Sequence, residues 1–158
     1  MTPRDDDYFL RRAGEGEKQV FFALNSPGCE DWPFEFARVV KEIGLVPIFY
    51  AGVGRDIVPK AGESGTLNDE ILDDFYFSKI TVLYFGPHKP GRDYEDHWVL
   101  SELPGVLARG RQPIVYASPS YPGEILRKFG LDRAPTTITG LAEFVLKLRQ
   151  DLQNVIQG

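Results

Sequence analysis

Residues 80–85 read Ile-Thr-Val-Leu-Tyr-Phe and decide the fold class. β-branched and aromatic side chains dominate this stretch, which predicts a strand buried on both faces. Stretches of a similar kind predict further strands, the last of them short; these are residues 19–25, 46–50, 113–117 and 136–139. Strands that are apolar throughout are typical of a parallel sheet covered on both sides.

Segments in which apolar residues recur at helical spacing separate these strands. They predict helices over residues 31–44, from 66 or 68 to 77, 95–109, 121–129 and 140–156. Asp31 is expected to cap the first helix, Pro33 fits its first turn, and Pro104 is expected to break the third helix. Strands that alternate with helices through right-handed crossovers leave few topologies. We predict an α/β fold with a flavodoxin-like, doubly wound parallel sheet of five strands in the order 2-1-3-4-5.

Length and charge narrow the class of protein. The chain has 158 residues and a formal net charge of −5, which suits one domain and argues against nucleic-acid or anionic-membrane partners. We expect residues 1–17 to form a polar tail, either disordered or a short added helix, and residues 18–158 to form a single domain. The charged N-terminus is unlike a secretory signal, the apolar runs are short for a membrane span, and Cys29 is the one cysteine. These features predict a cytoplasmic protein.

Ligands of doubly wound sheets bind beyond the carboxyl ends of the strands, near the point where the strand order reverses. The crevice is therefore expected to be lined by residues 25–29, 50–65 and 86–96. Known phosphate-binding loops are absent from the sequence, because Ile57 stands where the Gly52-Val53-Gly54 stretch would need its third glycine. Asp93 and His97 have metal-ligand spacing but no second ligand pair, so we expect no metal.

A glutamate is the best candidate for chemistry. Glu102 follows Trp98 by one helical turn and lies on the same side of the predicted helix, beside the apolar Leu103. A carboxylate next to the ligand crevice could stabilise or attack an oxocarbenium-like centre, as carboxylates do in glycoside chemistry. The alternative is an exposed glutamate, or one paired with Arg109 or Arg111, and the residue pattern alone favours this alternative.

Two short motifs carry a family resemblance. Residues 55–59 read Arg-Asp-Ile-Val-Pro, and residues 98–103 read Trp-Val-Leu-Ser-Glu-Leu. The first resembles the Arg-Asp-x-x-Pro-Gly stretch of the TIR (Toll/interleukin receptor) domain, and the second resembles that family's Trp-Cys-x-x-Glu-Leu motif. The resemblance covers about residues 18–155, although Lys60 replaces the family's glycine and Pro104 directly follows the second motif.

The resemblance implies roles for particular residues. In prokaryotic and some eukaryotic TIR domains the glutamate of the second motif cleaves the nicotinamide–ribose bond of NAD. Glu102 would then be the catalytic residue, and NAD would be a substrate, so no cofactor is expected. Asn25 and Ser26 would contact the substrate, and Arg55 and Asp56 would belong to a loop that gates or assembles the site.

A second resemblance leads to similar chemistry. Asp96 and Glu102 are spaced like the Asp-x-Gly-x-x-x-Glu of nucleoside 2-deoxyribosyltransferases, in which the glutamate is the nucleophile. His97 and Trp98 stand where that motif has its x-Gly pair, so this match is poorer. We include Asp96 and Trp98 among the candidate substrate-binding residues. Both relatives break an N-glycosidic bond, which supports the reaction class more than the choice of family.

We therefore predict a TIR-like NAD glycohydrolase, with a role in defence or signalling. Its expected partners are a small nucleotide substrate and a second copy of the chain or another TIR-like chain, with no nucleic acid and no membrane. One alternative is a non-catalytic TIR-like interaction module that assembles through residues 55–65. Another is a nucleoside or nucleotide N-glycosidase, or an enzyme like the deoxyribosyltransferases.

Overall fold

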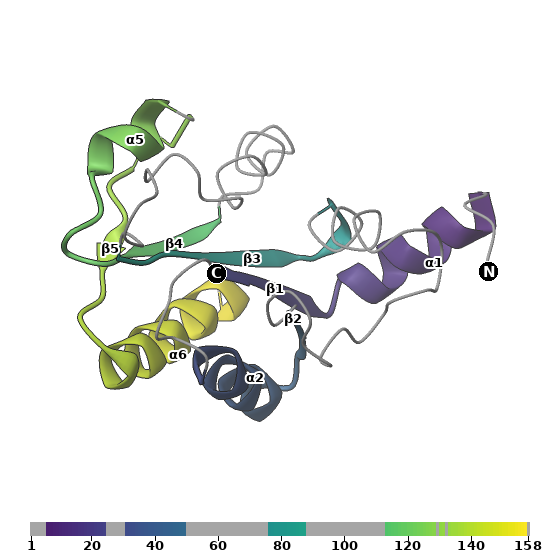
Figure 1. Cartoon of the computed structure of the whole chain (residues 1–158). Coiled ribbons are helices and arrows are strands. Elements are labelled where there is room, and N and C mark those ends of the chain that lie inside the picture. Colours follow the sequence, from purple (N-terminus) through teal and green to yellow (C-terminus); the bar gives the residue numbers. More distant parts are fainter. Residues whose placement is uncertain are drawn as a thin grey trace.

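A parallel sheet with the strand order β2-β1-β3-β4-β5 runs through the protein (Figure 1). The computed structural model describes residues 6–24, 31–49, 76–87, 113–128, 130–131 and 133–157. Within them the strands are β1 (Gln19–Leu24), β2 (Val46–Phe49), β3 (Ile80–Phe85), β4 (Ile114–Ala117) and β5 (Thr136–Thr137). The predicted α/β fold and its strand order are therefore confirmed.

The strands β1 and β3 form the centre of the sheet. Val20 pairs with Ile80, and the register continues to Leu24 and Tyr84. Every residue of β3 is buried, and Leu24 is the one residue of β1 that is partly exposed. Residues 80–85 show no polar alternation because a hydrophobic cluster lies on each face of the sheet.

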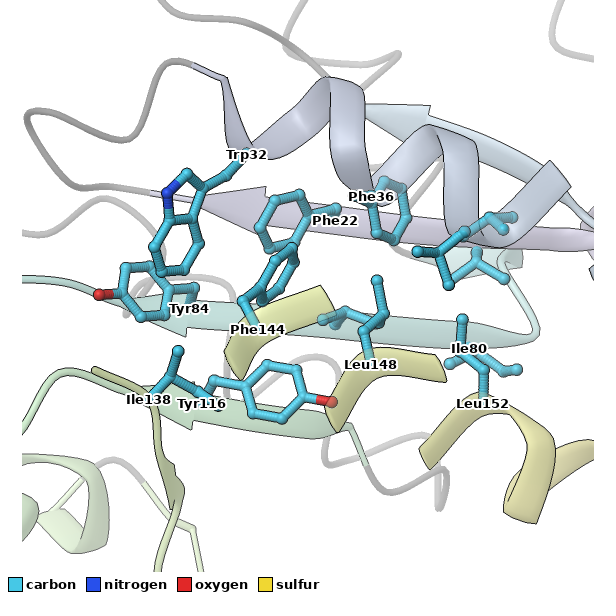
Figure 2. Packing of buried hydrophobic residues seen from close by; sticks show 14 residues of the cluster. Phe22, Trp32, Phe36, Ile80, Tyr84, Tyr116, Ile138, Phe144, Leu148 and Leu152 are labelled. Carbon is cyan, nitrogen blue, oxygen red and sulfur yellow. The ribbon is translucent and has the colours of Figure 1, made fainter. Parts of the chain in front are cut away.

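Two helices, α2 (Trp32–Ile43) and α6 (Leu141–Gln157), cover one face of the sheet (Figure 1). Their apolar stripes bury Phe36, Phe144 and Leu148 completely, as the helical spacing predicts. Figure 2 shows this layer, whose buried members are Val20, Phe22, Trp32, Phe36, Val39, Val40, Ile80, Val82, Tyr84, Tyr116, Ile138, Phe144, Leu148 and Leu152. The sheet and these helices thus form the larger hydrophobic cluster of the described residues.

The short helix α5 (Gly123–Lys128) lies on the opposite side of the sheet (Figure 1). Here a second cluster buries Phe21, Ala23, Ile48, Leu83, Phe85, Val115, Ala117, Tyr121, Leu126 and Leu131. The helix begins later than the predicted 121–129. The amide of Tyr121 closes a turn with the carbonyl of Ser118 before the helix starts, at a distance of 3.0 Å.

The N-terminal residues form a helix, α1 (Asp6–Gly16), which is one of the two outcomes that the sequence left open. Tyr8 and Arg12 are buried, so the helix is packed against the rest of the protein. The carbonyl of Gly16 accepts a hydrogen bond from the amide of Lys79 at 2.9 Å. The guanidinium of Arg12 lies 5.6 Å from the centre of the Phe77 ring. These contacts attach α1 near the start of β3, at the amino end of the sheet (Figure 1).

The sequence predicted the end of α2 at Gly44 correctly, but it predicted a side-chain cap at the start that the structure does not show. Gly44 terminates the helix in a left-handed conformation with φ 92°, which favours glycine. Asp31 stands at the N-cap position, but its side chain makes no capping hydrogen bond. Its backbone is already helical, with ψ −15°, whereas a capping side chain usually extends from a β-region residue. The expected cap is therefore wrong.

Two predicted helices, the one ending at residue 77 and the one over residues 95–109, lie almost wholly outside the described residues. Tyr76 and Phe77, the last residues of the helix expected to end at 77, are helical. The helix expected over 95–109 lies outside the described residues.

Candidate functional site

The carboxyl ends of neighbouring strands form one edge of the sheet. Leu24 at the end of β1 pairs with Tyr84, and Phe85 at the end of β3 pairs with Ala117. The chain runs from β1 to β2 on one side and then returns to β3 on the other, so the strand order reverses between β1 and β3. Ligands of open α/β sheets bind at such a switch point, outside the carboxyl ends of the strands. This edge is therefore the candidate site.

An aromatic pair, Trp32 and Tyr84, packs at this edge (Figure 2). Trp32 is the first residue of α2, and its ring centre lies 4.6 Å from that of Tyr84. Phe144 of α6 stacks on the same indole at 4.8 Å, with an angle of 27° between the rings. Trp32 is 7% exposed, so its indole supports the edge from within and is not placed to stack on a ligand.

A hydroxyl pair lies at the end of β4. Ser118 directly follows β4, and its amide donates to the carbonyl of Phe85 at 2.9 Å. Its Oγ accepts from the amide of Ser120 at 3.1 Å and lies 2.8 Å from the Ser120 Oγ. These bonds hold a polar turn across the strand end. Ser118 is buried and its hydroxyl is already hydrogen-bonded, so it orders the turn, and Ser120 is the exposed hydroxyl of the pair.

The predicted site residues belong to segments that leave the sheet at this same edge. Residues 25–30 follow Leu24, residues 50–75 follow Phe49, and residues 88–112 follow the short stretch after Phe85. The predicted residues lie outside the described ones; they are Asn25, Ser26, Arg55, Asp56, Asp96, Trp98 and Glu102. The structure places the strand ends from which their segments start, and their roles stay predictions.

Sequence reasoning missed the described residues that shape this edge. The sequence predicted a helix over residues 31–44 and a buried strand over residues 80–85, but it assigned neither Trp32 nor Tyr84 to the carboxyl edge. Their places in the chain carried the signal, because Tyr84 stands near the carboxyl end of β3 and Trp32 begins the helix that follows the carboxyl end of β1. Ser118 and Ser120 carried a signal too, since polar residues directly after an apolar strand meet at the carboxyl edge.

Tyr116 is a buried titratable group on the face covered by α6. Its hydroxyl donates to Oδ2 of Asp151 at 2.7 Å, which links β4 to α6. Desolvation by burial raises the pKa of Tyr116 far above its ordinary value, and the hydrogen bond to Asp151 raises it further. The phenol therefore keeps its proton at neutral pH and acts as a structural donor.

The described residues contain neither a cluster of metal ligands nor a helix that could span a membrane. Within residues 6–24, 31–49, 76–87 and the described parts of 113–157, no three His, Cys, Asp or Glu side chains gather closely enough to hold a metal ion. In that same part of the chain, no helix has the length and apolar character needed to cross a membrane.

Comparison with known proteins identifies the fold and nothing beyond it. No family model and no curated protein matches the chain. Among solved structures, it is similar to the rubredoxin oxygen:oxidoreductase of the anaerobe Desulfovibrio gigas, with a TM-score of 0.58 and 12% sequence identity. The match covers 94% of this chain but 38% of that protein, so the chain spans less than half of its length. At this identity the likeness concerns the backbone alone. Together with the observed strand order, it establishes that the chain has a flavodoxin-like α/β fold.

Proposed function

We propose that this chain cleaves the N-glycosidic bond between nicotinamide and ribose in NAD, with Glu102 as the catalytic residue. One observation carries the proposal. The strands β2, β1 and β3 are neighbours, and each leads at its carboxyl end into a segment that bears candidate residues. Because parallel strands end at a common edge, this order supports a shared site for segments that are distant in sequence.

The chemistry follows from the nature of the bond. The bond between the ribose C1′ and the pyridinium nitrogen breaks, and its electron pair stays on the nitrogen, so that nicotinamide leaves as a neutral molecule. Positive charge then develops on the ribose, and the carboxylate of Glu102 would stabilise it, as carboxylates do in glycoside hydrolysis. Water attacks C1′ and loses a proton, which gives ADP-ribose.

Binding of NAD to this acidic chain requires positive charge near the pyrophosphate. NAD carries a negatively charged pyrophosphate, while the chain has a net charge of −5. Local cations must therefore offset the repulsion, and Arg55 and Lys60 are the candidates in the segment after β2. High salt would weaken this attraction, so we expect KM for NAD to rise with ionic strength while kcat changes little.

The test is nicotinamide release from NAD by concentrated protein. Concentrated protein is used because the TIR resemblance implies a site completed by a neighbouring copy. We expect Glu102→Ala to lower the rate by about 100-fold or more, since catalytic carboxylates contribute on this scale. The matched control is Glu124→Ala, which removes an exposed carboxylate of α5 and should keep the wild-type rate.

The same assay separates the alternative functions. A nucleoside panel beside NAD identifies an N-glycosidase that spares NAD. Self-association that is lost on substitution of Arg55, with NAD and nucleosides untouched, identifies a non-catalytic module. Nicotinamide release by Glu102→Ala at the wild-type rate would falsify the assigned role of Glu102.

A further inference from the structure

We propose that Pro47 closes the outer edge of the sheet to a strand from a second copy of this chain. The strand β2 is the terminal strand of the sheet, and among the described residues it pairs with β1 alone. A terminal strand usually presents a row of unpaired N–H and C=O groups, to which another chain can add. The proposal concerns this backbone edge and does not rest on the function proposed for Glu102.

The pairing of β2 with β1 shows which backbone groups of β2 face outward. The amide of Val46 donates to the carbonyl of Lys18 at 2.8 Å, so Val46 faces β1. The backbone groups of successive strand residues point to opposite sides, and the register is continuous from Val46 to Phe49. Ile48 therefore also faces β1, whereas Pro47 and Phe49 face the outer side. Because proline has no N–H, position 47 offers no donor at this edge.

The missing donor falls where pairing with a second copy would need it. Two identical strands related by a two-fold axis run antiparallel. In the register that uses the whole of β2, Ile48 lies opposite its own copy, and Pro47 of each chain lies opposite Phe49 of the other. Each such outward-facing pair would exchange two N–H···O bonds. Pro47 removes one bond from each pair, so half of the ladder is lost.

The side chains near this edge would otherwise favour association. Val46 is 45% exposed, and Phe34, whose ring meets that of Phe49 edge to face at 6.0 Å, is 52% exposed. The strand β2 reads Val-Pro-Ile-Phe and carries no charge, so it lacks the charged side chains that protect many other sheet edges. An apolar terminal strand of this kind is prone to aggregate when its backbone is open. The proline is therefore the protective feature within the strand.

The opposite edge of the sheet repeats this arrangement. The strand β5 has two residues, and Pro135 directly precedes it. The amide of Ile138 donates to the carbonyl of Ala117 at 2.9 Å, so Ile138 and Thr136 face β4 and position 135 faces away. A proline thus occupies an outward position at each end of the sheet. Self-association of the wild type is therefore expected to use a surface other than the sheet edges.

The test restores the donor in the full chain. Pro47→Val supplies an N–H together with a side chain that favours strands, and Pro47→Ala supplies the N–H without that preference. Pro119→Val is the matched control, because it replaces an exposed proline in the turn after β4, outside the terminal strands. Size-exclusion chromatography with light scattering measures the mass of each protein over a range of concentrations, and circular dichroism checks that each is folded.

We expect both Pro47 variants to self-associate about tenfold or more tightly than the wild type, because each pair of copies gains two hydrogen bonds. Pro119→Val should keep the wild-type mass at every concentration. Hydrogen exchange supplies the signature of strand addition. The amides at positions 47 and 49 of the Pro47 variants should become protected as the concentration rises, while those of Val46 and Ile48, which face β1, should change little.

Several results would overturn the role of Pro47. A folded Pro47 variant that keeps the wild-type mass, or equal association of Pro119→Val, would show that the missing donor does not matter. Association without protection at position 49 would mean that side chains alone make the contact. Protection of the Phe49 amide in concentrated wild type would mean that the edge is open despite the proline. Nicotinamide release is a separate measurement, so its failure would leave this result standing.

Discussion

At the scale of single residues, the hydrogen bond from Tyr116 to Asp151 affects both the stability of the fold and its dependence on pH. Tyr116 is fully buried in β4, and Asp151 is partly exposed on α6. Removing the hydroxyl leaves the carboxylate free to find water, so the loss should be modest for a hydrogen bond to a charged group. We expect Tyr116→Phe to lower the free energy of unfolding by about 1–2 kcal/mol in a urea titration at neutral pH.

Because the pKa of Tyr116 is raised, we expect the protein to lose stability at alkaline pH. Its pKa is raised in the folded protein, so above about pH 10 the unfolded chain releases a proton that the folded protein retains. The folded state then binds more protons, and the free energy of unfolding falls as pH rises, by up to about 1.4 kcal/mol per pH unit. At neutral pH this contribution is fully present.

Urea titrations from neutral to alkaline pH measure this slope. Tyr116→Phe should flatten it, because the variant lacks the phenol whose pKa is raised in the folded protein. Equal slopes for Tyr116→Phe and the wild type would contradict the assignment.

At the scale of elements, substitutions of two glycines in α1 should have opposite effects on stability. A Cβ on Gly14 would meet no atom within 4 Å, so Gly14→Ala should stabilise the protein by about 0.5–1 kcal/mol through helix propensity. A Cβ on Gly16 would lie inside the contact distance of the Phe77 carbonyl oxygen. Gly16→Ala should therefore push α1 away from residues 77–79 and cost about 1–3 kcal/mol.

Thermal and chemical unfolding of the two variants tests this packing. Far-ultraviolet circular dichroism serves as the control, because both proteins should remain folded. If Gly16→Ala were as stable as Gly14→Ala, the close approach between α1 and Phe77 would not exist in solution.

The helix α6 allows a similar comparison along one element. Leu148 is completely buried between the helix and the sheet, while Leu146 is 53% exposed. Leu148→Ala should cost about 2–5 kcal/mol because it leaves a cavity, and Leu146→Ala should change stability by less than about 0.5 kcal/mol. Urea titrations of both variants measure the difference. Similar losses for the two would mean that α6 presents a different face to the sheet.

At the scale of the whole molecule, the fold class and strand order could be predicted from the sequence because apolar strands and amphipathic helices alternate regularly along it. β-branched and aromatic residues dominate residues 80–85, and the helical spacing of Phe36 and Phe144 identifies the buried faces of α2 and α6. Among the described residues, the two last strands were predicted slightly too long, and β4 begins at Ile114 rather than at residue 113. Residues 136–139 form a strand only over Thr136–Thr137, because the partner strand β4 ends at Ala117, opposite Thr137.

The candidate site was less accessible to sequence reasoning. A motif such as Trp98-x-x-x-Glu102 names residues but not their neighbours in space, and those neighbours depend on how distant segments meet. The contact of Trp32 with Tyr84 is an example, since it depends both on the pairing of β1 with β3 and on how α2 packs on the sheet. The predicted cap at Asp31 failed for a related reason, because a local preference does not determine the backbone angle that the surrounding structure imposes.

The pairing of β1 with two neighbours also sets an order of events during synthesis. On one side β1 pairs with β2, which leaves the ribosome soon after it. On the other side it must wait for β3, which is made only after the long connection between Phe49 and Ile80. Through that interval the apolar strand β1 has one unpaired edge, and such edges are where nascent chains aggregate. Chaperone dependence of this protein should therefore be greatest in nascent chains that end between β2 and β3, and should fall once β3 has emerged.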